Sequence, residues 1–177
     1  MRKHGLIPVF IFFILTACDY DAPLVGEASL PIDQAVLGTW ELIPDDQAGQ
    51  ESTVRAVIRQ ESGNEYAIEY IDDESIIYFR GWLAELEGIH FVQLEVTGTN
   101  KGPVGAEDTD LFGVLSYTLD NGVLVVRFLN TDLINAGLAD TAALQAAFAA
   151  NRNDPNLFHE PIQFRKLTDE SDEFPEK

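Results

Sequence analysis

Few side chains of this chain have the types and spacing that reactive chemistry requires. Cys18 is the single cysteine of the 177 residues, so it has no partner for an internal disulfide. The histidines beyond the first 17 residues are His90 and His159, and no His-x-x-x-His pair or cysteine cluster accompanies them. A zinc site needs three or four such ligands. Neither a Gly-x-Ser-x-Gly elbow nor a phosphate-binding loop occurs. The sequence therefore predicts no metal site, no cofactor and no catalytic residue.

Acidic residues are abundant, and three readings of them stay open. Glu107, Asp108 and Asp110 stand near glycines in one loop, a composition that could ligate calcium weakly. Paired carboxylates could also serve an enzyme acting on sugars or lipids. We favour the third interpretation, that these acidic residues are hydrated turn residues without a ligand. The chain has 30 acidic residues against 11 basic ones, so acidic pairs occur throughout it.

Cys18 ends a pattern that gives its thiol a role. Arg2 and Lys3 precede an apolar stretch over residues 6–15, which is about half the length of a membrane-spanning helix and fits a signal peptide. The following residues, Leu15-Thr16-Ala17-Cys18, resemble the lipobox of bacterial lipoproteins. That resemblance implies cleavage before Cys18, acylation of its sulfur, and membrane lipid as a partner. Two or three acyl chains anchor a protein far more firmly than one.

The same resemblance predicts where the protein is located. A bacterial lipoprotein with this leader is anchored in a membrane and faces the periplasm. Asp19, directly after the cysteine, resembles an inner-membrane retention signal and favours that membrane over the outer one. Removal of Arg2 and Lys3 with the leader takes the net charge from −19 to −21, which excludes nucleic acid as a partner.

Composition divides the chain into four parts. Residues 1–17 are the expected signal peptide, and residues 18–31 are interpreted as an acylated cysteine followed by a tether. Residues 32–168 form one domain, which we expect to be monomeric, and residues 169–177 an acidic disordered tail.

The domain alternates apolar and polar residues with a period of two, which predicts a mainly β fold. Asp120-Asn121-Gly122 is the clearest hairpin turn. The expected strands, eight in all, cover residues 39–43, 53–59, 65–70, 76–85, 89–96, 111–119, 123–129 and 161–167. Consecutive antiparallel strands of this number predict an eight-stranded up-and-down barrel, with an open sandwich as the alternative. One α-helix, over about 140–151, is expected between the seventh and eighth strands, against the barrel wall or across one end.

The start of the first strand carries a further resemblance. Gly38-Thr39-Trp40 resembles the G-x-W signature of lipocalins and related calycins. The resemblance implies that Trp40 closes one barrel end and that a late arginine packs across its ring. Arg165 is the matching position, and Arg127 is the alternative. Because the expected helix precedes the last strand, whereas in lipocalins it follows the eighth, we expect a lipocalin-like barrel. Residues 80–94 and 154–158 also resemble small uncharacterised bacterial lipoproteins.

The aromatic residues on the expected strands are candidates for a ligand-lining set. On inward faces they would line or fill an eight-stranded barrel, whose interior is just wide enough for side chains or one small ligand. These residues are Tyr66, Tyr70, Tyr78, Trp82 and Phe91. The sequence thus predicts a membrane-anchored, non-enzymatic, lipocalin-like barrel that takes a small apolar ligand. A module that binds an envelope protein through its acidic surface is the alternative, and an enzyme on lipids or sugars is a third.

Overall fold

The computed structural model describes residues 18–44, 52–73, 75–138 and 140–167. The predicted signal peptide, the lipobox residues before Cys18 and the predicted tail over 169–177 lie outside these ranges. The elements, in chain order, are η1 (Gln34–Val36), β1 (Gly38–Ile43), β2 (Arg55–Gln60), β3 (Glu65–Asp72), β4 (Ser75–Leu86), β5 (Ile89–Thr99), β6 (Gly102–Pro103), β7 (Phe112–Asp120), β8 (Val123–Phe128), α1 (Thr141–Asn151) and β9 (Ile162–Lys166).

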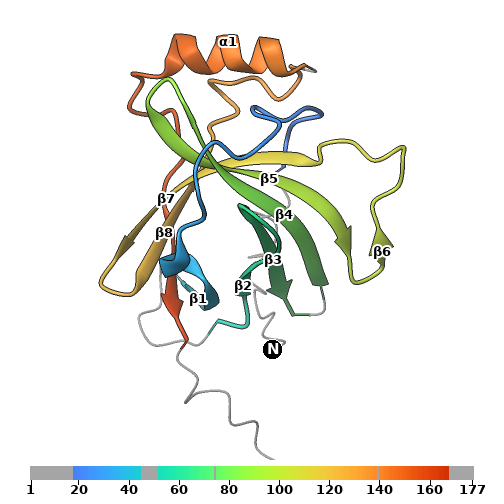
Figure 1. Ribbon diagram of the computed structural model, residues 1–177, viewed down its shortest axis with the longest axis vertical. Coiled ribbons are helices and arrows are strands. Elements are labelled where there is room, and N and C mark those ends of the chain that lie inside the picture. Colours follow the sequence, from blue (N-terminus) through green and yellow to red (C-terminus); the bar gives the residue numbers. More distant parts are fainter. Residues whose placement is uncertain (1–17, 45–51, 74, 139, 168–177) are drawn as a thin grey trace, which may run out of the picture.

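Eight of the described strands form a closed barrel (Figure 1). Each strand pairs antiparallel with its neighbour in the order β4-β3-β2-β1-β9-β8-β7-β5, and β5 pairs back to β4. The two-residue β6, which the sequence did not predict, pairs only with the end of β5. The predicted up-and-down barrel is confirmed, and the β4–β5 pairing rules out the open sandwich.

The hairpin turns follow from residue types that accept a left-handed backbone. Asn121 and Gly122 both have positive φ, 51° and 80°, as a two-residue turn between β7 and β8 requires. Glu87 and Gly88 make the same kind of turn between β4 and β5, with φ of 54° and 78°. These turns fix the register, which decides which side chains enter the barrel.

The helix α1 confirms the prediction of one helix before the last strand. Asp140 caps its N-terminus, because its side chain accepts a hydrogen bond of 2.8 Å from the backbone N–H of Ala143. Leu144 and Phe148 point from the helix toward the sheet and are almost completely buried. The rings of Phe148 and Phe91 lie 5.7 Å apart, so α1 packs on the outer face of β5 and not inside the barrel.

Residues 18–31, which the sequence predicts to be a tether, are bonded to the barrel at several points. Tyr20 forms an antiparallel bridge with Phe112, and its hydroxyl donates to the carbonyl of Ile134 at 2.7 Å. The backbone N–H groups of Ser29 and Leu30 both donate to a carbonyl of β4 at 3.2 Å. The segment is held because its few apolar side chains and its backbone find partners on the barrel, which composition alone does not reveal.

The described residues form two hydrophobic cores on opposite faces of the β4–β5 hairpin. The barrel core lies inside the sheet and includes Trp40, Tyr66, Tyr70, Phe79 and Phe164. The outer core lies between the sheet's outer face, α1 and the N-terminal segment; among its members are Tyr20, Leu24, Trp82, Phe91 and Phe148. Because neighbouring residues of a strand point to opposite faces, β4 and β5 contribute to both cores.

Candidate binding cavity of the barrel

The barrel holds a partly open cavity of about 110 Å³, lined by residues of η1, β2, β3, β4, β5, β7, β8 and β9. Apart from three tyrosines, every side chain in its wall is aliphatic or phenylalanine. Several inward-facing side chains remain partly exposed instead of being packed tightly: Ile58, Ile68, Leu115, Tyr117, Phe128 and Ile162. A filled protein core would bury such residues completely. The barrel interior is therefore apolar and incompletely filled.

One end of the cavity is closed by η1, which two of the tyrosines fasten to the barrel. The hydroxyl of Tyr66 accepts a hydrogen bond of 2.6 Å from the backbone N–H of Asp33. The hydroxyl of Tyr117 donates to the Asp33 carboxylate at 3.0 Å, and that carboxylate also accepts from Ala35 N–H at 2.9 Å. Burial raises the pKa of Tyr117, as does its bond to Asp33, so the phenol stays protonated and remains a donor.

Trp40 lies at the same end and is completely buried. Its indole N–H donates to the carbonyl of Val36 at 2.8 Å, which joins β1 to η1. The cation over its ring is Lys166, with Nζ 5.2 Å from the ring centroid. The Lys166 side chain also lies over Gly38, where φ is +130° and an added Cβ would come within 3.0 Å of it.

The prediction that Arg165 or Arg127 packs across Trp40 is wrong. Arg165 pairs across the sheet with Glu41, whereas Lys166 pairs with Trp40. Since the side-chain period is two, Arg165 faces outward and binds the buried Glu41 carboxylate there. Arg127 lies beside Ser116 in the wall of a polar groove outside the barrel. The sequence placed the cation on the correct strand but one residue early.

The third tyrosine, Tyr70, lies nearer the other end of β3. Tyr66 pairs with Gln60 beside the β2–β3 turn, and Tyr70 pairs with Ile77 close to the β3–β4 turn. Only 8% of Tyr70 is exposed, yet its hydroxyl has no hydrogen-bond partner in the described structure. Burial, reinforced by Asp72, raises the pKa of Tyr70, so the hydroxyl stays neutral.

Cys18 lies in the same part of the barrel core as Tyr70 and Phe79. Its side chain is buried, and burial, with a smaller effect of Asp19, raises the pKa of the thiol to about 12. A thiol with this pKa holds almost no thiolate at neutral pH and is a poor nucleophile in the folded chain. The predicted lipidation of Cys18 thus concerns a residue beside the cavity and not one on a distant tether.

The five predicted lining aromatics separate into two groups. Tyr66 and Tyr70 line the cavity. Trp82 and Phe91 do not, because their strands turn them into the outer core, and Tyr78 is 37% exposed. The prediction is wrong for these three. For Trp82 and Phe91, the reason is that inward and outward positions of β4 and β5 are both apolar where both faces are covered.

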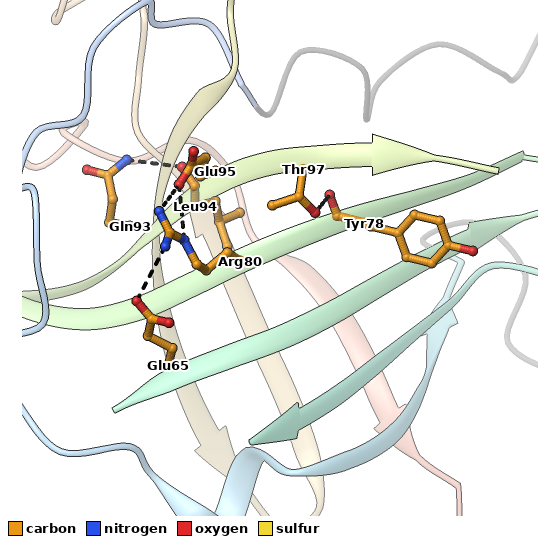
Figure 2. A network of polar contacts seen from close by, with 7 residues as sticks. All are labelled: Glu65, Tyr78, Arg80, Gln93, Leu94, Glu95 and Thr97. Atoms are coloured by element: carbon orange, nitrogen blue, oxygen red, sulfur yellow. Dashed lines mark hydrogen bonds and ion pairs between the residues drawn. The ribbon is translucent and has the colours of Figure 1, made fainter. Parts of the chain in front are cut away.

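Figure 2 shows a network of polar contacts around Arg80 on the outer face of the sheet. The Arg80 guanidinium donates to Glu95 at 2.5 and 3.1 Å and lies 3.7 Å from Glu65. It also lies 5.5 Å from the Trp82 ring centroid. Tyr78 points away from this network, although its backbone carbonyl accepts from Thr97. These contacts are cross-strand surface pairs and stabilise the sheet instead of forming a site.

Gln93 is the structural residue that the sequence analysis overlooked. It is completely buried, and its side-chain oxygen accepts from Leu24 N–H at 2.7 Å and Val25 N–H at 3.2 Å. Its amide nitrogen donates to the carbonyls of Gly113 at 2.9 Å and Leu94 at 3.2 Å. A lone amide between the apolar residues Val92 and Leu94 was the available signal. The side chain holds the N-terminal segment on the barrel.

The other candidate residues from the sequence do not come together in one site. His90 is exposed and pairs with Glu85 at 2.8 Å, and His159 lines the polar groove that includes Arg127. The loop weighed as a weak calcium ligand set is exposed, and Asp108 accepts there from Gly105 N–H at 2.7 Å. Within the described ranges, no three His, Cys, Asp or Glu side chains are grouped as metal ligands would be.

No helix in the described part of the chain is both long and apolar enough to span a membrane. The chain was also compared with known proteins. No protein-family model matches it, and neither a curated protein nor a solved structure does.

Proposed function

We propose that this protein is a non-catalytic, lipocalin-like binding protein that holds a small apolar ligand in its barrel. The observation that carries the proposal is the cavity of about 110 Å³ with a wall of aliphatic, phenylalanine and tyrosine side chains. The wall offers water no polar surface, so filling the cavity with hydrocarbon gains contacts without displacing strongly bound water.

The size of the cavity limits the ligand. Pockets for drug-sized molecules occupy about 300–1,000 Å³, and a dry cavity of about 150 Å³ accepts benzene. The cavity here is smaller than either. The ligand is therefore a short hydrocarbon, or the apolar end of a longer molecule.

We further propose that the protein is anchored in a bacterial membrane through acylated Cys18 and faces the periplasm. The lipobox supports the anchor, and the burial of Cys18 beside Tyr70 and Phe79 adds a geometric consequence. A thioether-linked lipid is far larger than the space that the thiol occupies. Acylation therefore has to precede folding of this segment, and it brings the end of the barrel near Tyr70 to the bilayer.

Ligand binding is tested by filling the cavity. Ala56 points into it, whereas Ala67 on the adjacent strand pairs with Arg59 and Arg80 on the outer face. Pentane should raise the unfolding temperature of the wild type and of Ala67→Phe, because a ligand that binds only the folded state stabilises it. It should have no effect on Ala56→Phe. Pentane that stabilises all three proteins equally, or none of them, contradicts the proposal.

The anchor is tested by Cys18→Ala, since alanine fits a buried apolar position better than serine does. The variant should leave the membrane fraction and lose the gel-mobility shift of the acylated chain. Asp19→Asn in the same expression system serves as the control and should keep both. Unchanged membrane association of Cys18→Ala would overturn the anchor while leaving the cavity proposal intact.

A further inference from the structure

Outside the barrel, a polar groove of about 420 Å³ lies where the segment after α1 runs beside β7 and β8 (Figure 1). The backbone holds this segment in place, because Leu129 forms a β-bridge with Phe158 and the N–H of His159 donates to the carbonyl of Phe128 at 2.8 Å. Pockets for small molecules occupy about 300–1,000 Å³, so the groove has room for one. In contrast to the barrel cavity, it presents mainly polar surface.

Arg127 lines this groove, and its guanidinium has no partner in the described part of the chain. The other arginines of the described ranges each form an ion pair with a glutamate: Arg55, Arg59, Arg80, Arg152 and Arg165. An unpaired arginine stands out in a chain with 30 acidic and 11 basic residues. The guanidinium also reaches solvent, since the unpartnered polar side-chain atoms that are fully buried in these ranges belong to Tyr70 and Trp82. It is therefore free to bind a ligand.

The groove also contains a carboxylate without a partner. Glu160 is exposed, and its side chain has no ion pair or hydrogen bond within the described ranges. Asp154 differs, because its carboxylate accepts from the N–H of Asn156 at 2.8 Å. Arg127 and Glu160 line one groove and yet do not pair with each other. Two opposite charges that stay apart match a ligand with a negative charge at one end and a positive charge at the other.

We propose that this groove binds a small zwitterion, an amino acid or short peptide, whose carboxylate meets Arg127 and whose ammonium group meets Glu160. A guanidinium binds a carboxylate through two parallel hydrogen bonds. Ser116 lies opposite Arg127 on β7, and its hydroxyl, which has no partner in the described chain, supplies a further donor. A net charge of −19 repels a simple anion, whereas a zwitterion carries no net charge. The inference goes beyond the proposed function, because this second site involves neither the cavity nor the anchor.

The test compares alanine and dialanine with derivatives that lack one of their two charges. The amides have no carboxylate, and the N-acetyl derivatives have no ammonium group. Calorimetric titration of the purified full-length protein at pH 7 measures each affinity. We expect the zwitterion to bind about tenfold more tightly than either derivative, as the loss of one charge-assisted hydrogen bond implies. Tighter binding of alanine supports an amino acid as the ligand, and tighter binding of dialanine supports a peptide.

Variants assign the two charges to their partners. Arg127→Gln should remove the preference for the free carboxylate over the amide, and Glu160→Gln should remove the preference for the free ammonium group over its acetyl derivative. Arg59→Gln is the matched control, because it removes the same charge from an exposed ion pair on β2 and should keep both preferences. The inference is overturned if neither zwitterion binds, or if the derivatives bind as tightly. Preferences that survive in Arg127→Gln and Glu160→Gln also overturn it.

Discussion

The two cores of this protein are built from the same strands, yet they are packed differently. The outer core buries Phe91, Leu144 and Phe148 almost completely beneath α1. In the barrel core, Leu115 and Phe128 face inward but stay partly exposed beside the cavity. In the described chain, each core holds a buried polar group without a hydrogen-bond partner, the Tyr70 hydroxyl inside the barrel and the Trp82 indole N–H outside it, while Gln93 on the outer side makes four hydrogen bonds.

The two cores therefore differ in what their packing favours: that of the outer core favours stability, and that of the barrel core leaves space. A core without gaps provides most of the free energy of folding, because each buried side chain loses its contact with water and gains packing contacts. A core that keeps a cavity gives up part of that free energy and retains space for a ligand. In this chain, α1 and most apolar residues of the N-terminal segment pack on the outer core. They supply the stability that the hollow interior lacks.

The largest expected effect comes from removing the same side chain in each core. Phe148→Ala should lower the free energy of unfolding by about 3–5 kcal/mol, because it leaves a void in a tightly packed site. Phe128→Ala should lower it by about half as much, since Phe128 is partly exposed and already borders empty space. Urea unfolding of both variants measures the contrast. Equal losses would mean that the barrel interior is as tightly packed as the outer core.

The attachment of the N-terminal segment gives the next largest effect. Gln93→Ala leaves the backbone N–H groups of Leu24 and Val25 buried without an acceptor, and should lower the free energy of unfolding by about 2–4 kcal/mol. Hydrogen exchange at these two amides should accelerate more than exchange in β8. Gln60→Ala removes a glutamine from an exposed strand end and should change the stability by less than about 0.5 kcal/mol. Similar losses for the two variants would show that the segment does not depend on Gln93.

The sequence predicted those features that depend on local patterns. Alternating residues around Ala56 and Leu124, and turn residues such as Asn121 and Gly122, were sufficient for the eight barrel strands, their order and closure. Asp140 was sufficient for the start of the helix. These signals act within a few residues, so they can be read without knowing the fold.

The sequence did not predict which apolar strand face looks into the cavity. Trp82 and Phe91 were assigned to the cavity because both faces of β4 and β5 carry apolar residues there. The alternation then does not show which face points into the barrel. The cation over Trp40 was displaced by one residue, from Lys166 to Arg165, because register is set by pairing across strands. Tyr117, which alternates with Leu115 toward the cavity, could have been found from the pattern. The free hydroxyl of Tyr70 could not, since satisfaction of a polar group depends on the whole barrel.

Within the barrel core, two tyrosines on one strand should respond differently to loss of their hydroxyls. Tyr66→Phe leaves Asp33 N–H without its acceptor and should cost about 1–2 kcal/mol of unfolding free energy. Tyr70→Phe removes a hydroxyl that has no partner and should leave the stability unchanged or raise it slightly. Urea unfolding without ligand provides the comparison. A loss for Tyr70→Phe as large as that for Tyr66→Phe would mean that the Tyr70 hydroxyl already has a partner in the free protein.

The smallest effect is expected at Asp19, between Cys18 in the barrel core and Tyr20 in the outer core. Burial raises the pKa of the Asp19 carboxyl, Asp110 raises it further, and His159 opposes the shift. The folded chain therefore binds this proton more tightly than the unfolded chain does. The resulting contribution to stability is complete below the ordinary aspartate pKa of about 3.9 and is lost as the pH rises through the higher folded value.

The test is the difference in unfolding free energy between wild type and Asp19→Asn, followed upward from pH 3. Asparagine cannot ionise, so the variant should gain stability relative to the wild type as the pH rises through this window. Asp120→Asn, on the exposed β7–β8 turn, should show no comparable rise. A flat difference for Asp19→Asn would mean that its carboxylate is as well solvated in the folded chain as in the unfolded one, and that the junction between the two cores is open to water.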